Sequence, residues 1–295
     1  MLGLSLHAPA PAAEGGSTEY VGGYTGFAAG YVPPDPGSYL TSELYYYDGG
    51  VSKLAANGRL ALQIGTDIYF ETVQLTELTS WRLLGGAYGF GVALPFGYCG
   101  VHGQVEPPGI ERSASAWGLG DAALVPAFLG WHSGDWYANV ALSVFAPTGQ
   151  YDENQPVNLS KNFWAVDTAF SGSYLSQHGL DLSFSLGYTV NFENPDTHYR
   201  SGDVTHLDLA LGQYLTREFK VGVVGYAVVQ VSGDSGSGAI LGPFKSDVYA
   251  AGTALEFDPT LAGREISLQL RWYREFGARN HLEGNAVYLT TDLKL

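Results

Sequence analysis

A histidine and three carboxylates are the residues best suited to chemistry in this chain. His206 and Asp208 stand two positions apart, and Asp167 and Asp181 occur earlier, in segments of the same alternating pattern. A histidine beside carboxylates can transfer protons, but hydrolysis also needs a nucleophile. No Gly-x-Ser-x-Gly sequence is present, and the His132-Ser133 pair falls at an expected turn. We therefore expect a polar hydrogen-bonded network and no catalytic residues.

Two further charged residues share one face of a later segment. Arg271 and Glu275 stand four positions apart in an alternating stretch, so their side chains point the same way. Arg59, Lys220 and Lys294 offer further positive partners. Charged side chains enclosed by protein must pair or stay wet. The pattern predicts an ion-paired lining, and its functional alternative is a polar constriction that selects permeants.

Other kinds of site have little support. Residues Gly85 to Gly91 are rich in glycine, but they open a strand pattern and no helix follows, so phosphate binding is not expected. The seven histidines lack metal-ligand spacing, and the single cysteine, Cys99, is interpreted as a small apolar residue. We expect no metal and no cofactor.

The elements that would position these groups are strands with two unlike faces. From Leu180 to Phe192 the sequence LDLSFSLGYTVNF alternates large apolar residues with Asp, Ser, Gly, Thr and Asn. A period of two is typical of a β-strand. Soluble sheets usually show Lys, Glu and Arg to water, whereas this small polar face suits a confined wet interior. The apolar face therefore suits lipid.

The same alternation recurs along the chain in pairs of segments joined alternately by short and long connections. About twelve strands are expected, and the segments are Leu40 to Tyr47, Arg59 to Glu71, Tyr88 to Tyr98, Leu119 to Gly130, Trp136 to Phe145, Phe163 to Tyr174, Leu180 to Phe192, His206 to Tyr214, Lys220 to Ser232, Val248 to Phe257, Glu265 to Glu275 and Val287 to Leu295. An even number of antiparallel strands, with short periplasmic turns and longer extracellular loops, is typical of a single-chain outer-membrane barrel.

Composition favours the same class. Only 15% of the 295 residues are charged, against roughly 25% in soluble domains. There is no apolar run long enough for a transmembrane helix, so a membrane-spanning chain must form a closed all-β barrel. The net charge of −15 speaks against nucleic acid as a partner. We expect a monomer in contact with outer-membrane lipids.

The chain divides into three parts. Residues 1–13 resemble a truncated signal peptide, which implies export. Residues 14–36 are rich in Gly and Pro and cannot sustain a strand ladder, so they form either a plug in the barrel or a flexible periplasmic lead. Residues 37–295 form the barrel.

The polar side of each strand is expected to line the lumen. In the second strand this rule places Asp67 inward and Ile68 and Phe70 toward lipid. The predicted lining, which is also the predicted substrate path, is Tyr45, Tyr47, Asp67, Asp121, Asn139, Asp167, Asp181, His206, Asp208, Gln230, Arg271 and Glu275. Tyr45 and Tyr47 are expected to capture an apolar solute near the outer mouth.

Several short stretches carry a family resemblance. They are Pro33-Pro34-Asp35-Pro36-Gly37-Ser38-Tyr39, Gly118-Leu119-Gly120-Asp121, Pro147-Thr148-Gly149-Gln150-Tyr151, Ser201-Gly202-Asp203 with His206 and Asp208, Gly242-Pro243-Phe244-Lys245, and Glu275-Phe276-Gly277 with Asn280 and Glu283-Gly284. In this order they resemble the outer-membrane family named "MetA-pathway of phenol degradation", over roughly Gly22 to Leu295. The resemblance implies an outer-membrane transporter for apolar or aromatic compounds and no catalytic residues.

The sequence thus predicts a non-enzymatic channel of the bacterial outer membrane for passive uptake of small hydrophobic or aromatic compounds. Two alternatives remain open at this point. An outer-membrane lipid hydrolase would need Ser, His and an acid aligned on outward faces. A soluble all-β ligand-binding protein would bury the apolar face against itself.

Overall fold

The protein is an all-β structure. The computed structural model describes residues 18–55, 60–106, 109–240, 242–261 and 263–295, so the expected signal peptide lies outside the described residues. No helix in this part of the chain is long and apolar enough to cross a membrane.

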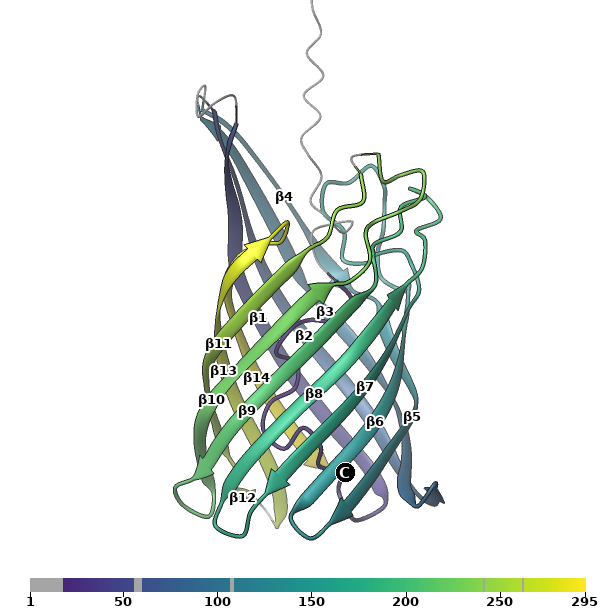
Figure 1. The fold of residues 1–295 in the computed structure, drawn as a ribbon, viewed down its shortest axis with the longest axis vertical. Helices are drawn as coiled ribbons and strands as arrows, with labels where there is room; N and C mark the ends of the chain where they lie inside the picture. The colour runs from purple at the N-terminus through teal and green to yellow at the C-terminus, as the bar shows by residue number, and fades with distance from the viewer. Residues whose placement is uncertain (1–17, 56–59, 107–108, 241, 262) are drawn as a thin grey trace, which may run out of the picture.

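Twelve antiparallel strands close into a barrel within the described residues (Figure 1), which confirms the expected number. The ring closes because β1 pairs with β14 and β11 pairs with β13, which leaves no open edge at the level of the wall. The barrel strands are β1 (Gly37–Ala55), β2 (Leu60–Leu83), β3 (Gly86–Glu106), β5 (Ala122–Ser133), β6 (Trp136–Ala146), β7 (Ala165–Leu175), β8 (Leu180–Asn191), β9 (Val204–Tyr214), β10 (Phe219–Gln230), β11 (Asp247–Phe257), β13 (Arg264–Arg279) and β14 (Glu283–Lys294).

Two further strands extend this ring. Strand β4 (Ile110–Leu119) pairs with the upper part of β3, and β5 follows it along the same strand after a break at Gly120 and Asp121. The two-residue strand β12 (Thr260–Leu261) pairs with the start of β13.

The two rims of the barrel differ as the sequence predicts. At one rim, tight connections at residues 84–85, 134–135, 176–179 and 215–218 join neighbouring strands. Gly85 and Gly134 have φ values of 79° and 59°, a left-handed conformation that glycine adopts readily. At the opposite rim, residues 147–164, 192–203, 231–240 and 242–246 lie in longer loops. These rims are called the short-turn rim and the loop rim below.

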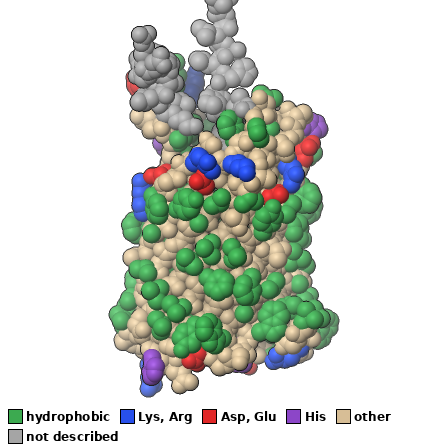
Figure 2. All heavy atoms as spheres, in the orientation of Figure 1, with side chains coloured by type: hydrophobic (Ala, Val, Ile, Leu, Met, Phe, Trp, Pro, Cys, Tyr) green, Lys and Arg blue, Asp and Glu red, His purple; other side chains and the backbone are tan. Residues whose placement is uncertain are grey.

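The alternation predicted for Leu180 to Phe192 is present in β8, which covers Leu180–Asn191. Leu186 is 49% exposed on the outside of the barrel, whereas Ser185 is 1% exposed on the inside. Similar outward residues on the other strands form an apolar belt, and Figure 2 shows it with charged side chains gathered above and below. Exposure of so large an apolar belt to water would be unfavourable, so the belt does not fit the alternative of a soluble all-β protein.

A row of aromatic rings crosses four neighbouring strands on the outer face. Tyr46 of β1, Tyr69 of β2, Tyr98 of β3 and Trp117 of β4 are direct cross-strand neighbours. Their successive ring centroids lie 4.7, 6.2 and 4.9 Å apart. Tyrosine and tryptophan rings of this kind mark a membrane boundary. Trp81 stacks on Tyr88 near the short-turn rim, at the opposite boundary.

Beyond this aromatic row, β1 to β4 continue as a four-stranded sheet, which we call the outer sheet. It comprises residues 47–55, 60–68, 99–106 and 110–116, and it rises past the rest of the loop rim in Figure 1. Gly50 is the last β1 residue that pairs with β14, and β4 pairs with β3 alone.

The expected facing of β2 is wrong. Ile68 and Phe70 face the interior, and Asp67 lies on the outer face with 39% of its side chain exposed. Asp67 lies just beyond the aromatic row, and its carboxylate is 4.0 Å from His102. A carboxylate is favourable there because that part of the wall has left the apolar belt. The rule that polar residues point inward therefore fails at this row and above it.

Residues 18–36 run through the inside of the barrel, as the dark purple trace in Figure 1 shows. Phe27 is buried among inward residues of the later strands, including Val224, Tyr226 and Tyr273. The hydrophobic core of the described chain therefore lies between this segment and the wall formed by β9, β10, β11, β13, β14 and β1. We call residues 18–36 the N-terminal segment.

Candidate functional site

One carboxylate holds much of the N-terminal segment. Asp208, on the inner face of β9, accepts hydrogen bonds from the backbone N–H groups of Gly23 and Thr25, both at 3.1 Å, and from the Thr25 hydroxyl at 2.8 Å. The Tyr20 hydroxyl donates to the same carboxylate. Four donors from one stretch of chain make Asp208 the principal anchor of the segment.

Ion pairs in the barrel wall supply further anchors. Arg271 Nη2 lies 2.7 Å from Glu43 and donates to the Tyr24 carbonyl at 3.0 Å. Lys220 lies 2.9 Å from Asp181, which also accepts a hydrogen bond from the backbone N–H of Ala28. The expected ion-paired lining therefore also binds the segment.

Glycines let the segment approach the wall closely. A Cβ at Gly30 would come within 2.6 Å of the Ser173 backbone nitrogen and 2.7 Å of the Tyr137 carbonyl. A Cβ at Gly22 would lie 2.6 Å from the Tyr226 ring. Neither contact is possible for a larger residue unless the segment moves.

His206 belongs to this network and has no free path to a substrate. Its Nε2 lies 3.0 Å from Asp167, and the Tyr20 ring stacks on its imidazole with centroids 3.3 Å apart. The side chain is fully buried, and its Nδ1 has no hydrogen-bond partner. A lipid hydrolase would need its histidine on the outer face, so His206 does not serve that alternative.

A second carboxylate organises the wall near the loop rim. Glu275 accepts hydrogen bonds from the hydroxyls of Tyr47 and Tyr226, both at 2.7 Å, and from the backbone N–H of Gly284 at 2.8 Å. None of these donors belongs to the N-terminal segment. Glu275 thus stabilises the barrel itself.

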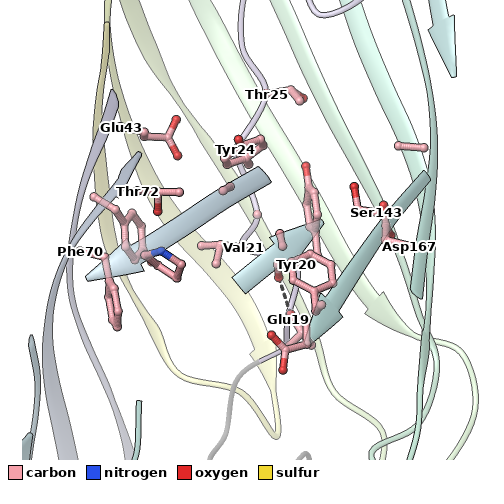
Figure 3. Close-up of a pocket in the computed structure, with 18 of the residues that line it drawn as sticks. Glu19, Tyr20, Val21, Tyr24, Thr25, Glu43, Phe70, Thr72, Ser143 and Asp167 are labelled. Carbon is pink, nitrogen blue, oxygen red and sulfur yellow. Dashed lines mark hydrogen bonds between the residues drawn. The ribbon is translucent and has the colours of Figure 1, made fainter. Parts of the chain in front are cut away.

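A cavity of about 620 Å³ remains between the N-terminal segment and the opposite wall. The wall side carries Ile68, Phe70, Ala93, Val125, Phe128 and Phe145 from β2, β3, β5 and β6. Figure 3 shows Tyr20, Val21 and Tyr24 of the segment between Phe70 on one side and Ser143 and Asp167 on the other. A mostly apolar lining with a few polar groups is typical of a site for a small organic molecule.

Acidic residue Glu19 marks the end of this cavity nearest the 147–164 loop. The pKa of its carboxyl is raised from 4.5 to about 8, mainly because the group is buried; Lys161 opposes this rise and Asp121 adds to it. The Glu19 Oε1 atom is buried without a hydrogen-bond partner. The protonated form is therefore favoured when the segment is docked.

All of the predicted lining residues except Asp67 point into the barrel. Those in contact with the segment or the cavity are Tyr45, Tyr47, Asp121, Asn139, Asp167, Asp181, His206, Asp208, Arg271 and Glu275, and Gln230 is bound to Asp234 near the loop rim. Their role as a substrate path stays a prediction. The predicted lining did not include Glu43, Ile68 or Phe70, which all face the cavity. Of these, only Glu43 had a signal in the sequence, because it alternates with Leu40 and Leu44 and shares the face of Tyr45 and Tyr47.

Metal binding has no visible basis in the described residues, because no three His, Cys, Asp or Glu side chains converge there.

The fold is similar to those of solved outer-membrane proteins. The COG4313 outer membrane channel from Pseudomonas putida F1 matches with a TM-score of 0.67 and 11% identity, over 91% of this chain and 98% of that one. The translocator domain of autotransporter NalP from Neisseria meningitidis gives a TM-score of 0.47 at 13% identity, over 88% of each chain. A comparison with curated proteins found no significant match.

The closed barrel, its apolar belt and its similarity of fold to the COG4313 channel place the protein in the bacterial outer membrane. Short turns are typical of the periplasmic rim of such barrels and longer loops of the outer rim, so the short-turn rim lies in the periplasm and the loop rim outside. A family model described as "Putative MetA-pathway of phenol degradation" matches residues 50–291, most of the barrel. This match confirms the resemblance noted in the sequence, and the chain belongs to that family.

Proposed function

We propose that the protein is a passive outer-membrane channel for small hydrophobic or aromatic compounds. The observation that carries this proposal is the apolar cavity between the N-terminal segment and the β2, β3, β5 and β6 walls. Its volume of about 620 Å³ is within the range of small-molecule sites. A water-filled pore of general use would instead show polar side chains around its whole circumference.

The two halves of the barrel have different tasks in this proposal. The inner faces of β7 to β11 and β13 hold ion pairs and buried polar groups that fix the segment. The inner faces of β2, β3 and β6 carry Phe70, Ala93 and Ala141, which leave space for a solute. Polar groups such as Thr72 and Ser143 can accept or donate one hydrogen bond to a phenolic hydroxyl.

Filling the cavity tests this function. Ala93→Trp places a large ring where the third strand leaves space, and we expect it to abolish protein-dependent uptake of radiolabelled toluene by whole cells. Ala251→Trp is the matched control because residue 251 lies on the lipid face of β11. Both variants should still migrate as folded barrels on gels before heating. Uptake by Ala93→Trp at the wild-type rate would refute the cavity as the route.

A further inference from the structure

The outer sheet has a mainly apolar inner face and a polar outer face. Arg112 of β4, which pairs with Gly103, also has an inward position and is exposed. Beside it, Val51 of β1, Ile64 of β2, Val101 and Val105 of β3 and Ala114 of β4 occupy inward positions and are partly buried. We call these five residues the inner strip. They share the inward register of Tyr47, Ile68 and Cys99 without a bulge between them.

The opposite face of the outer sheet is polar. Its positions beyond the aromatic row are occupied mainly by Asp48, Ser52, Gln63, Asp67, His102, Gln104, Glu111, Ser113 and Ser115. Below that row the arrangement is reversed, because outward residues such as Leu44, Leu94 and Phe96 are apolar and exposed to lipid. The polarity of the two faces therefore inverts at the membrane boundary.

Lipid cannot explain an apolar face above the boundary. The outer sheet stands at the level of the sugar and phosphate headgroups, where the outward polar residues are well solvated. A sheet surrounded by that layer would be expected to carry polar residues on both faces. The inner strip is therefore an apolar surface that needs a different occupant.

The strip is continuous with the cavity of the proposed channel. Ile68 and Cys99 are paired neighbours on β2 and β3, and both line the cavity. Thr66 and Val101 are the next inward pair above them, followed by Ile64 and Gly103. A Cβ added at Gly103 would meet no atom closer than 3.9 Å, so the surface is open at this point. A mainly apolar track, with Thr66 within it and Arg112 at its β4 edge, thus runs from Val105 to the cavity.

The size of the strip fits a small molecule. Four strands spaced about 4.8 Å apart give a width of roughly 14 Å, and the strip is about as high, so its area is on the order of 200 Å². A stable protein partner would need about 800 Å² on each side. A solute with one or two aromatic rings can be covered by an area of this size.

We propose that the inner strip is a capture surface that binds small apolar or aromatic solutes beyond the lipid boundary and passes them to the cavity. This inference rests on the proposed channel function and adds the place where a solute is first bound. The strip gives such a solute an apolar contact within a polar layer that dissolves it poorly. Capture should raise uptake most at low solute concentration, where encounter limits the rate.

Two inner-strip variants and one control test the proposal with the full chain in cells that carry an intact outer leaflet. Val101→Asn and Val105→Asn each place an amide in the strip. His102→Asn makes a similar change on the polar face of the same strand. The probe is radiolabelled naphthalene, and initial uptake is measured over a range of concentrations. Assembly of all variants is first checked by heat-modifiable migration on gels. Val105→Asn tests the proposal should Val101→Asn fail to assemble.

We expect the strip variants to lower uptake at limiting naphthalene by about fivefold, because each loses apolar contact with the solute. Uptake at saturating naphthalene should be unchanged, and His102→Asn should match the wild type throughout. If the wild type takes up naphthalene no faster than cells without the protein, the channel function itself fails. If the wild type transports but the strip variants equal it, or the control falls equally, only the capture surface is refuted.

Discussion

Replacing Asp208 by alanine should release the N-terminal segment and open the lumen. The carboxylate accepts four hydrogen bonds from Tyr20, Gly23 and Thr25. Hydrogen bonds to a charged group contribute at least about 1.5 kcal/mol each, so four independent bonds would contribute about 6 kcal/mol. Water replaces part of these bonds after release, and coupled bonds are not additive, so we expect about 3 kcal/mol. That change multiplies the undocked fraction by roughly a hundred.

Single-channel conductance in planar bilayers measures this release. Openings of Asp208→Ala should be larger and more frequent than those of the wild type, because the segment then vacates the lumen. Glu275→Ala is the matched control, since the hydrogen bonds to Glu275 come from Tyr47, Tyr226 and Gly284 and from no described residue of the segment. The reasoning is refuted if Asp208→Ala conducts like the wild type, or if Glu275→Ala opens to the same extent.

The close packing of the segment, the lipid face and the buried Glu19 carboxyl each give a further testable expectation. Gly30→Ala should also raise conductance, because its Cβ would meet the backbone of β7 at 2.6 Å, whereas Gly103→Ala should have no effect. Leu186→Arg on the lipid face should lower the free energy of unfolding by about 2 to 4 kcal/mol in a urea titration in lipid vesicles, and Gln63→Arg above the membrane should change it little. Burial raises the pKa of Glu19 from 4.5 to about 8, so the segment takes up a proton when it docks. Docking should therefore weaken, and conductance increase, as the pH rises from about 4.5 to about 8. Glu19→Gln should remove this pH dependence of the conductance.

The alternation of the later strands could be predicted from sequence because each face has one kind of neighbour. In β8, Leu182 and Leu186 meet lipid while Ser183 and Ser185 meet a crowded polar interior. Two unlike surroundings impose a strict period of two. The number of strands and the short turns follow from the same regularity.

The facing of β2 could not be predicted in this way. Ile68 and Phe70 face an apolar cavity, and Asp67 lies in the headgroup region, so the polarity of each face is the reverse of that in β8. A period of two shows that the faces differ, but it does not show which face is inside. Knowledge of where the strand leaves the membrane is needed, and that depends on its neighbours in the barrel.

The path of the N-terminal segment through the barrel could not be predicted from the residue types of the segment. Its anchors are backbone N–H groups and carbonyls of Gly23, Thr25 and Ala28, which every residue type supplies. The one sequence signal is the spacing of Gly22, Gly26 and Gly30 at every fourth position. Each of these glycines lies against the wall, where a side chain would collide.

The aromatic row and the Trp81–Tyr88 pair mark the two membrane boundaries, so the strand length between them gives the thickness of the apolar layer that the barrel spans. Tyr98 lies in this row, and Tyr88, stacked on Trp81, lies at the opposite boundary of the same strand. The ten residue steps between them cover about 33 Å at roughly 3.3 Å per step. A strand inclined by about 45° then spans about 23 Å across the bilayer, close to the roughly 25 Å of an outer membrane. The rings of β3 thus record the depth of apolar lipid that the protein is built to match.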